Sequence, residues 1–422
     1  MSLRPATRQG VIKKNKHKPT SSSLTILNQL CNLIPPHLVA KLARETGVEE
    51  RARTFTPWSH VVALVYAQLT HSLGLNDVCD ALQLHSGPLS AVRGARAPYK
   101  NTFSYANRNR DPKLGERLFY SMLEHLGKLQ PGFGGKHQPR FVFRFKRIMH
   151  VVDSTTIGLM ARSLDWAKHL RRKAAAKCHV RLDLQTFLPR CALVETAAVQ
   201  DCRRARELCA AIKPGEIVIF DKAYTDFSHM ADLSMREVFF VTRARDDLRY
   251  RVVRRLQPGR QGNILRDEMI RWRLLDSQKA YPENLRRVSA LVEVEGQQRE
   301  MAFLTNNFSW SPQTIADLYR CRWQIEKFFK ELKQTLQLAD FLGHSEGAVK
   351  WQVWTALLTY LLLRFCAWIS QWSHSFTRLF ALLRSALWQK LELRSLLLSC
   401  GTAAGGGRFL GQPEQAYFAG FR

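Results

Sequence analysis

The run Leu318-Tyr-Arg-Cys-Arg-Trp-Gln-Ile-Glu-Lys-Phe-Phe-Lys-Glu-Leu-Lys333 has the residue spacing of an amphipathic helix. At roughly 100° per residue its reactive polar groups fall within a sector about 60° wide; they are Tyr319, Arg322, Glu326 and Lys333. An adjacent sector at about 220° to 280° holds apolar groups, which are Leu318, Ile325, Phe329, Leu332 and Leu336. The pattern predicts a helix that packs by its apolar stripe and presents the polar groups at the rim of a site. For this run alone, a solvated charged face is the alternative.

Two upstream segments share another design, an apolar strand that ends in a carboxylate. They are Arg147-Ile-Met-His-Val-Val-Asp153-Ser-Thr-Thr and Glu216-Ile-Val-Ile-Phe-Asp221-Lys-Ala-Tyr224. A single aspartate at a strand end commonly caps the next turn, so neither segment is specific by itself. Together with Glu326 they make a set of three carboxylates, and hard divalent cations such as Mg²⁺ require oxygen donors of this kind. The sequence therefore predicts a metal site formed by Asp153, Asp221 and Glu326.

These motifs resemble those of the DDE transposases of bacterial insertion sequences, in the insertion-sequence-four family. The resemblance rests on the three acids and on the Tyr-x2-Arg-x3-Glu-x6-Lys spacing that begins at Tyr319. Further matches are the Asp221 and Tyr224 pair and the run Ser345-Glu-Gly-Ala-Val-Lys350 before a long apolar stretch. The likeness covers roughly residues 20 to 370. The four-residue signature is specific, whereas either aspartate motif alone is weak.

The resemblance implies a fold and an activity. The expected fold class is α/β: a ribonuclease H-like catalytic core interrupted by a β-rich insertion domain, with an N-terminal all-α DNA-binding domain and a helical C-terminal region. The expected function is to bind the terminal inverted repeats of an insertion sequence, to cleave the element ends by Mg²⁺-dependent hydrolysis through a hairpin intermediate, and to join the 3′ ends to target DNA. The expected partners are double-stranded DNA and a second copy of the chain in a synaptic complex.

The resemblance also implies roles for individual residues. Asp153, Asp221 and Glu326 are the expected catalytic and metal-binding residues, with two Mg²⁺ ions about 3.5 to 4 Å apart and Mn²⁺ as a substitute. The expected DNA or phosphate contacts are Tyr319, Arg322, Lys333, Lys177, Tyr224 and Trp272. Arginine suits a phosphate as a planar fork and lysine as a point charge. For Tyr224 and Trp272, packing in the core is the competing interpretation.

Composition limits the classes of partner. The 422 residues include 64 Lys and Arg against 35 Asp and Glu, a formal net charge of +29, which favours a polyanion such as nucleic acid. The nine cysteines form no Cys-x-x-Cys pair, so we expect reduced thiols and a cytoplasmic protein. The family resemblance implies a bacterial, nucleoid-associated one. The apolar run from Trp351 to Ile369 contains Gln352 and Arg364 and is barely long enough for a membrane span, which favours a core helix. We expect no membrane partner.

Patterning predicts six segments along the chain. They are a disordered basic tail (1–22), a helical DNA-binding domain (23–130), the first part of the core (147–243), a β-rich insertion domain (244–298), the second part of the core (299–370), and a helical C-terminal region with a flexible tail (371–422). A linker rich in Gly, Pro, Arg and Lys lies between residues 132 and 146. The insertion is inferred because 104 residues separate Asp221 from Glu326, too many for a usual connection.

Several alternatives stay open at this stage. The helices near residues 57–82 suit a helix-turn-helix DNA reader, yet a plain helical bundle has the same pattern. Asp201 is expected to cap a helix. His179 is not expected to bind metal, because three carboxylates suffice. For the whole chain, the alternatives are a metal-dependent nuclease without strand transfer and a catalytically silent or domesticated DNA-binding repressor.

Overall fold

The computed structural model describes residues 18–48, 54–72, 74–134, 146–159, 168–170, 173–196, 201–257, 262–294, 296–335 and 342–400. Most of the predicted basic tail, most of the predicted linker, Leu336 and the predicted flexible tail from residue 401 onward lie outside these ranges.

The N-terminal region is helical, as predicted. Its helices are α1 (Ile26–Cys31), α2 (Leu38–Glu45), α3 (Pro57–Thr70), α4 (Leu75–Leu84), α5 (Ser86–Ser90), α6 (Lys100–Asn109) and α7 (Lys113–Leu129). Helix α3 begins where the sequence indicates, because Thr56 accepts a hydrogen bond from the Ser59 N–H and Pro57 occupies the first turn. It ends at His71, whose left-handed backbone (φ 58°) stops the helix.

The central sheet combines antiparallel and parallel pairing. Its first six strands are β1 (Met149–Leu159), β2 (Lys168–Leu170), β3 (Lys173–Asp183), β4 (Leu188–Thr196), β5 (Ile217–Phe220) and β6 (Phe239–Arg243). Strand β3 pairs antiparallel with β1, β2 and β4, whereas β1, β5 and β6 run parallel in that order. Apolar alternation gives each central strand two buried faces: Ile217 and Ile219 enter one core cluster, and Val218 and Phe220 enter another.

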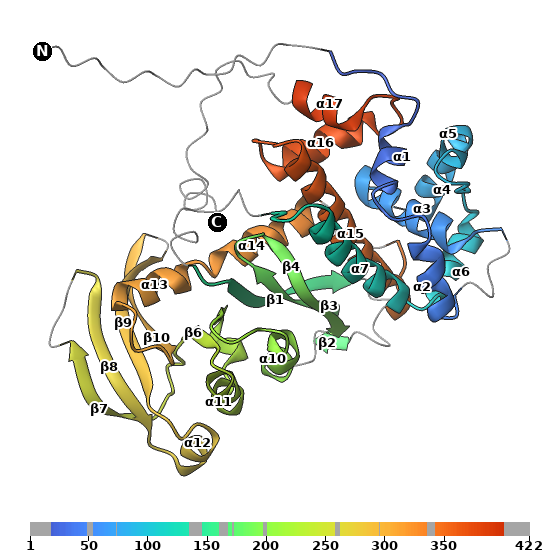
Figure 1. Ribbon diagram of the computed structural model, residues 1–422. Helices are drawn as coiled ribbons and strands as arrows, with labels where there is room; N and C mark the ends of the chain where they lie inside the picture. The colour runs from blue at the N-terminus through green and yellow to red at the C-terminus, as the bar shows by residue number, and fades with distance from the viewer. Residues whose placement is uncertain are drawn as a thin grey trace, which may run out of the picture.

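Helices cover both faces of this sheet (Figure 1). Helices α10 (Asp201–Cys209) and α11 (Phe227–Met235) lie on one face, and the smaller core cluster fills the space between them and the strands. On the other face lie α13 (Pro312–Arg320), α14 (Trp323–Lys330), the π-helical turn η4 (Glu331–Thr335) and α15 (Glu346–Ile369). The result is a three-layer α/β arrangement, in agreement with the predicted class.

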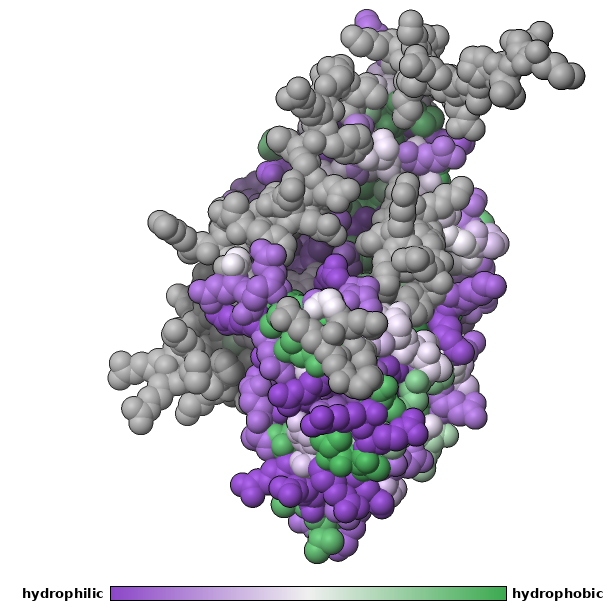
Figure 2. Space-filling model, turned by 90° about the vertical axis from the view of Figure 1, so that its left-hand side faces the viewer, coloured by the Kyte–Doolittle hydropathy of each residue, from purple (hydrophilic) through white to green (hydrophobic). Residues whose placement is uncertain are grey.

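The insertion continues the same sheet. Strands β7 (Tyr250–Gln257), β8 (Ile264–Trp272), β9 (Leu285–Val294) and β10 (Gln297–Thr305) follow β6 in the order β6-β10-β9-β8-β7, with the short helix α12 (Leu275–Ala280) between β8 and β9. Strand β10 pairs antiparallel with β6, so it crosses the predicted boundary at residues 298/299. The prediction of β structure holds here, but the insertion and the core share one sheet. Figure 2 views this side of the molecule and shows a mainly hydrophilic surface with small apolar patches.

Helix α15 is the central helix of the larger core. It packs against α3, α6 and α7, and at Gly115 of α7 an added Cβ would lie 3.2 Å from atoms of Trp351 and Trp354. By length and composition α15 would be able to cross a membrane, but 78% of its most apolar window is buried inside the protein. The prediction of a core helix is confirmed. Helices α16 (Phe376–Ala386) and α17 (Leu393–Ser399) complete the described C-terminal region, which meets the N-terminal region through a bridge between Ser21 and Leu391.

Candidate active site

Two predicted acids stand side by side on the parallel strands β1 and β5. The register pairs Val152 with Phe220, so Asp153 and Asp221 are the next residues on adjacent strands. Strand β5 ends at Phe220, and Asp221 caps the single 3-10 turn η3 (Lys222–Tyr224). Strand β1 continues past Asp153, held by antiparallel pairing with β3. Because buried apolar residues fix both strands, the two carboxylates emerge from a rigid part of the sheet.

The run from Leu318 to Lys333 is not one helix, which corrects the prediction. Helix α13 ends at Arg320, and the N–H groups of Cys321 and Arg322 bond to carbonyls three residues earlier, the pattern of a tighter 3-10 turn. Helix α14 then runs to Lys330 and passes into η4, a wider π turn. The assumed 100° per residue therefore fails at both junctions. The apolar stripe is nevertheless buried at Leu318, Ile325, Phe329 and Leu332.

Side chains from this run reach all three acids. One Arg322 nitrogen, Nη1, lies 2.8 Å from Asp153 Oδ2, and the other, Nη2, lies 3.0 Å from Glu326 Oε1. The Tyr319 hydroxyl donates to Asp221 Oδ1 at 3.0 Å. The second oxygen of Asp153 accepts the N–H of Ser154 at 2.8 Å. Three acids from β1, the end of β5 and α14 thus gather around one guanidinium and one phenol.

The electrostatics of the site follow from burial and from this gathering of charge. Burial raises the pKa of Asp153 to about 6; Arg322 and the Ser154 N–H oppose that rise, and the charges of Asp221 and Glu326 add to it. Burial likewise raises the pKa of Tyr319, with Asp221 contributing in the same direction, so its hydroxyl remains a donor near neutral pH. The three carboxylates place negative charges close together, which a nearby cation stabilises. In this structure the guanidinium of Arg322 is in contact with two of them, Asp153 and Glu326.

Lys333 lies at the far end of the same site. Its ammonium group donates to the carbonyl of Thr156 on β1 at 2.7 Å. The π turn that carries it is fixed to the core, because Glu331 pairs with Arg364 of α15, and Arg364 donates to the Tyr360 hydroxyl at 2.9 Å. Lys333 therefore contacts β1 from a fixed backbone. Its partner on β1, Thr156, lies three residues after Asp153.

The donor set suits a hard divalent cation by its chemistry, since it consists of carboxylate oxygens. Among the residues that the structure describes, no three His, Cys, Asp or Glu side chains close on a common point. The reason is visible at the site: Arg322 lies between Asp153 and Glu326, and Tyr319 holds Asp221. In this structure Arg322 and Tyr319 are the hydrogen-bond partners of Asp153, Asp221 and Glu326.

The remaining predicted contacts lie deeper than expected. Tyr224 and Trp272 are each 1% exposed, so neither offers a surface to DNA, which contradicts the prediction of direct contact. Trp272 packs on Phe227 of α11 with ring centroids 4.4 Å apart, in agreement with the competing interpretation as core. The Lys177 side chain is 13% exposed and donates to Asp201 at 3.2 Å, so its charge is paired inside the protein.

Sequence reasoning missed two features of the site. Trp323 is 54% exposed and lies 5.3 Å from the Arg322 guanidinium, which places a large aromatic surface beside the acids. Its angular position next to the polar sector was a usable signal. The second feature is a buried polar cluster around Asp201, which contacts Ser154 and residues of β3. No local pattern indicates that cluster, because its members come from five separate elements.

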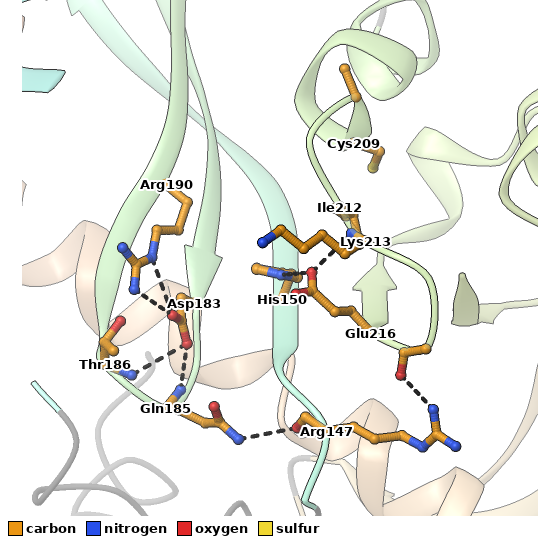
Figure 3. Close-up of polar contacts among 12 residues, drawn as sticks. Arg147, His150, Asp183, Gln185, Thr186, Arg190, Cys209, Ile212, Lys213 and Glu216 are labelled. Atoms are coloured by element: carbon orange, nitrogen blue, oxygen red, sulfur yellow. Dashed lines mark hydrogen bonds and ion pairs between the residues drawn. The ribbon is translucent and has the colours of Figure 1, made fainter. Parts of the chain in front are cut away.

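A different polar cluster occupies the opposite end of the central strands (Figure 3). Asp183 accepts the N–H groups of Gln185 and Thr186 and a two-nitrogen contact from Arg190, all in the β3–β4 hairpin. His150 shares a 2.9 Å hydrogen bond with Glu216 at the starts of β1 and β5. These contacts close the turns that connect the strands.

Comparison with known proteins identifies the family of this chain. Residues 145–362 match the family described as the transposase DDE domain, and residues 22–92 match a domain of unknown function. A protein of Sinorhizobium fredii described as a transposase, y4zB, is 29% identical over 255 residues, which are 60% of this chain and 70% of that protein. A Geobacillus stearothermophilus protein described as the transposase for insertion sequence element IS5377 is 25% identical over 352 residues, 83% of this chain and 85% of that protein.

A Synechocystis protein described as a transposase for insertion sequence element IS4SA is 21% identical over 267 residues, 63% of this chain and 70% of that protein. A solved piggyBac transposase synaptic complex with hairpin DNA aligns with 88% of this chain and 83% of its own at 12% identity and a TM-score of 0.41. The matched DDE domain spans more than half of the 422 residues and contains Asp153, Asp221 and Glu326. The chain belongs to the DDE transposase family, whose members are phosphoryl-transfer enzymes.

Proposed function

We propose that this insertion-sequence transposase cleaves and joins DNA at a site formed by Asp153, Asp221 and Glu326. The observation that carries the proposal is the meeting of these acids, from three elements, around Arg322 and Tyr319. Metal-dependent phosphoryl transfer requires a cluster of carboxylates that can hold cations, with side chains beside it that can bind phosphate. The three acids, with Arg322 next to them, provide such a cluster at the ends of parallel strands.

The strand order supports a ribonuclease H-like core. Three antiparallel strands, β4, β3 and β1, lead into the parallel strands β5 and β6, with helices on both faces. We assign residues 147–243 and 299–370 to this core, residues 244–298 to the insertion and residues 23–130 to a DNA-binding domain. The continuity of the sheet across β6 and β10 means that core and insertion act as one body.

Each residue at the site has a proposed task. Asp153, Asp221 and Glu326 would hold divalent cations, which would activate the attacking oxygen and stabilise the leaving oxygen. Arg322 turns from the acids to clamp a phosphate as a planar fork, and Lys333 adds a point charge beside β1. Tyr319 holds Asp221 in place until DNA arrives. The exposed ring of Trp323 offers a stacking surface to an unpaired base in a hairpin.

The substrate we propose is the pair of terminal inverted repeats, followed by target DNA. The +29 charge supports a polyanionic partner, and Arg251, Arg254 and Arg255 are exposed on β7 of the insertion. Water frees a 3′-hydroxyl at each element end, and that hydroxyl attacks the opposite strand, which closes a hairpin and releases the flanking DNA. A second water then opens the hairpin and restores the 3′-hydroxyl, which attacks the target. Two copies of the chain hold two ends, which prevents breakage at a single end. Acting on chromosomal DNA places the enzyme in the bacterial cytoplasm, at the nucleoid.

A strand-transfer assay tests the proposal. Element ends with their flanking DNA, taken from either side of the reading frame, are incubated with Mg²⁺ and a plasmid target. We expect nicked ends, hairpins and joined products. Pre-cut ends that are never joined would favour a nuclease without strand transfer, and binding without any cleavage would favour a repressor.

A further inference from the structure

A largely buried polar cluster adjoins the two aspartates through Ser154 and Tyr224, and nothing in the proposed chemistry uses it. Its centre is Asp201, the first residue of α10. One oxygen of Asp201, Oδ1, accepts the Ser154 hydroxyl at 3.0 Å and the Lys177 ammonium at 3.2 Å, and it lies 3.4 Å from Nδ1 of His179. Asp201 was expected to cap its own helix. Its carboxylate binds side chains of the sheet.

His179 carries the cluster toward the second aspartate. It is fully buried on β3, directly opposite Ser154 in the β1–β3 register. Its Nδ1 shares a 2.9 Å hydrogen bond with the hydroxyl of Tyr224, and the two rings meet edge to face with centroids 6.1 Å apart. Its other nitrogen, Nε2, lies 3.0 Å from Glu195 on β4, without hydrogen-bond alignment. The imidazole is thus fixed between two carboxylates and a phenol.

The two ends of the cluster adjoin the two acids. Ser154 follows Asp153, and its N–H bonds to the Asp153 carboxylate. Tyr224 closes the single turn η3 that Asp221 begins, and its N–H bonds to the Asp221 carbonyl at 3.0 Å. A movement of Asp201 would therefore reach both Asp153 and Asp221. Buried polar groups of this kind hold their neighbours in one arrangement, because an unmatched donor or acceptor is costly there.

We propose that Asp201 is a positioning residue for phosphoryl transfer, which fixes Asp153 through Ser154 and Asp221 through His179 and Tyr224. The inference rests on the proposed catalytic roles of the two acids. Asp201 touches neither DNA nor the reacting atoms. It sets the spacing between two strand ends that must share a cation.

The first test is Asp201→Asn, which keeps the size of the side chain and removes its charge. We expect cleavage of saturating element-end DNA to slow by about 10- to 100-fold, as when a partner of a metal ligand is lost. The KM for DNA and the thermal midpoint should stay near wild type, and Mn²⁺ binding measured by electron paramagnetic resonance should weaken. Cleavage and Mn²⁺ binding at wild-type levels would overturn the proposal.

The matched control is Asp226→Asn on the neighbouring helix. Asp226 is the true N-cap of α11, where it accepts the His229 N–H at 2.8 Å, and asparagine caps helices equally well. This variant makes the same chemical change at the start of a helix outside the cluster. We expect wild-type cleavage from it.

Tyr224→Phe keeps the test decisive if Asp201→Asn fails to fold, because it removes only the hydroxyl from a buried ring. We expect a slower cleavage step at unchanged thermal stability; a wild-type rate would count against the proposal. When both variants fold, their effects on cleavage should not add, since both act through one cluster. Asp153→Asn separates failure of the proposed active site from failure of the positioning role. If Asp153→Asn cleaves like wild type, the proposed active site is wrong. If Asp153→Asn is inactive while Asp201→Asn is fully active, only the positioning role of Asp201 is wrong.

Discussion

The two ends of strands β1 and β5 carry similar polar residues but pair them in opposite ways. At the start of the strands, Asp183 takes all its contacts from Gln185, Thr186 and Arg190, within seven residues of itself. At the other end, Asp153 pairs with a residue 169 positions away and Asp221 with one 98 positions away. One end closes a hairpin. The other end depends on a helix that belongs to a distant part of the chain.

This difference separates stability from chemistry. The Asp183 carboxylate already has hydrogen-bond partners in its own hairpin, so it contributes to the stability of the fold. Asp153 keeps a pKa raised to about 6 by burial despite the contact with Arg322. Its partner is a cation on a separate element, and a metal ion or a DNA phosphate can compete for either member of that pair. The following predictions test this contrast, from the largest expected effect to the smallest.

Replacing Asp153, Asp221 or Glu326 should abolish cleavage. Asp153→Asn, Asp221→Asn and Glu326→Gln remove the charge that a divalent cation requires, while the size of each side chain is kept. Gel-shift affinity for element ends should stay close to wild type, because the carboxylates do not hold phosphate. Substantial Mg²⁺-dependent cleavage by any one variant would remove that residue from the site.

The helix that brings the distant partners should have two separable faces. Phe329→Ala truncates a buried side chain and should lower the unfolding free energy by about 3 to 5 kcal/mol. Arg322→Ala should slow cleavage at saturating Mg²⁺ by about tenfold or more, since a charge-assisted contact contributes about 1.5 to 3 kcal/mol. Denaturant titration and single-turnover kinetics measure the two effects. Unfolding by Arg322→Ala together with a stable Phe329→Ala would reverse the assignment of the faces.

At the start of the strands, the same type of substitution should act on stability alone. Asp183→Asn leaves the Arg190 guanidinium without its carboxylate and should lower the unfolding free energy by about 1 to 3 kcal/mol. Cleavage by the folded fraction should match wild type. A catalytic defect at full stability would mean that the two ends are coupled more tightly than their contacts indicate.

The smallest effect concerns pH. Burial lowers the pKa of His150, against the opposing influence of Glu216, so the folded protein holds this imidazole neutral. The unfolded chain binds the proton more readily below about pH 6.5. Stability present above that pH should therefore be lost as the pH falls. His150→Gln should reduce the slope of unfolding free energy against pH by up to about 1.4 kcal/mol per unit. An unchanged slope would show that His150 does not titrate on unfolding.

The sequence predicts the site acids because their signals are local. An apolar run that ends in aspartate specifies a strand and its end, and the parallel register then sets Asp153 beside Asp221. The buried stripe of α14 was equally predictable, since Ile325 and Phe329 follow helical spacing. Glu326 faces the strands for the same reason.

Other features depend on tertiary contacts that leave no periodic trace. The 3-10 turn before α14 and the π turn at Glu331 break an otherwise regular helical pattern, and Arg364 of α15 fixes the second of them. Asp201 has the position of a helix cap, but Ser154 and Lys177 take its carboxylate. The alternating stretch Arg287-Val-Ser-Ala-Leu-Val-Glu-Val294 in the insertion is typical of a strand, but it does not show that the insertion joins the core sheet next to β6.

The shared sheet limits how this enzyme can be rebuilt. Strand β6 has β5, which leads to Asp221, on one side and β10 on the other. A chimera that exchanges the insertion as a cassette at its root would open an edge next to the active site and invite aggregation. Length changes at the far hairpin of β7 and β8 leave that edge covered. Engineered loops, tags and fused domains therefore belong at the outer hairpin, and natural variation in the size of the insertion should concentrate there as well.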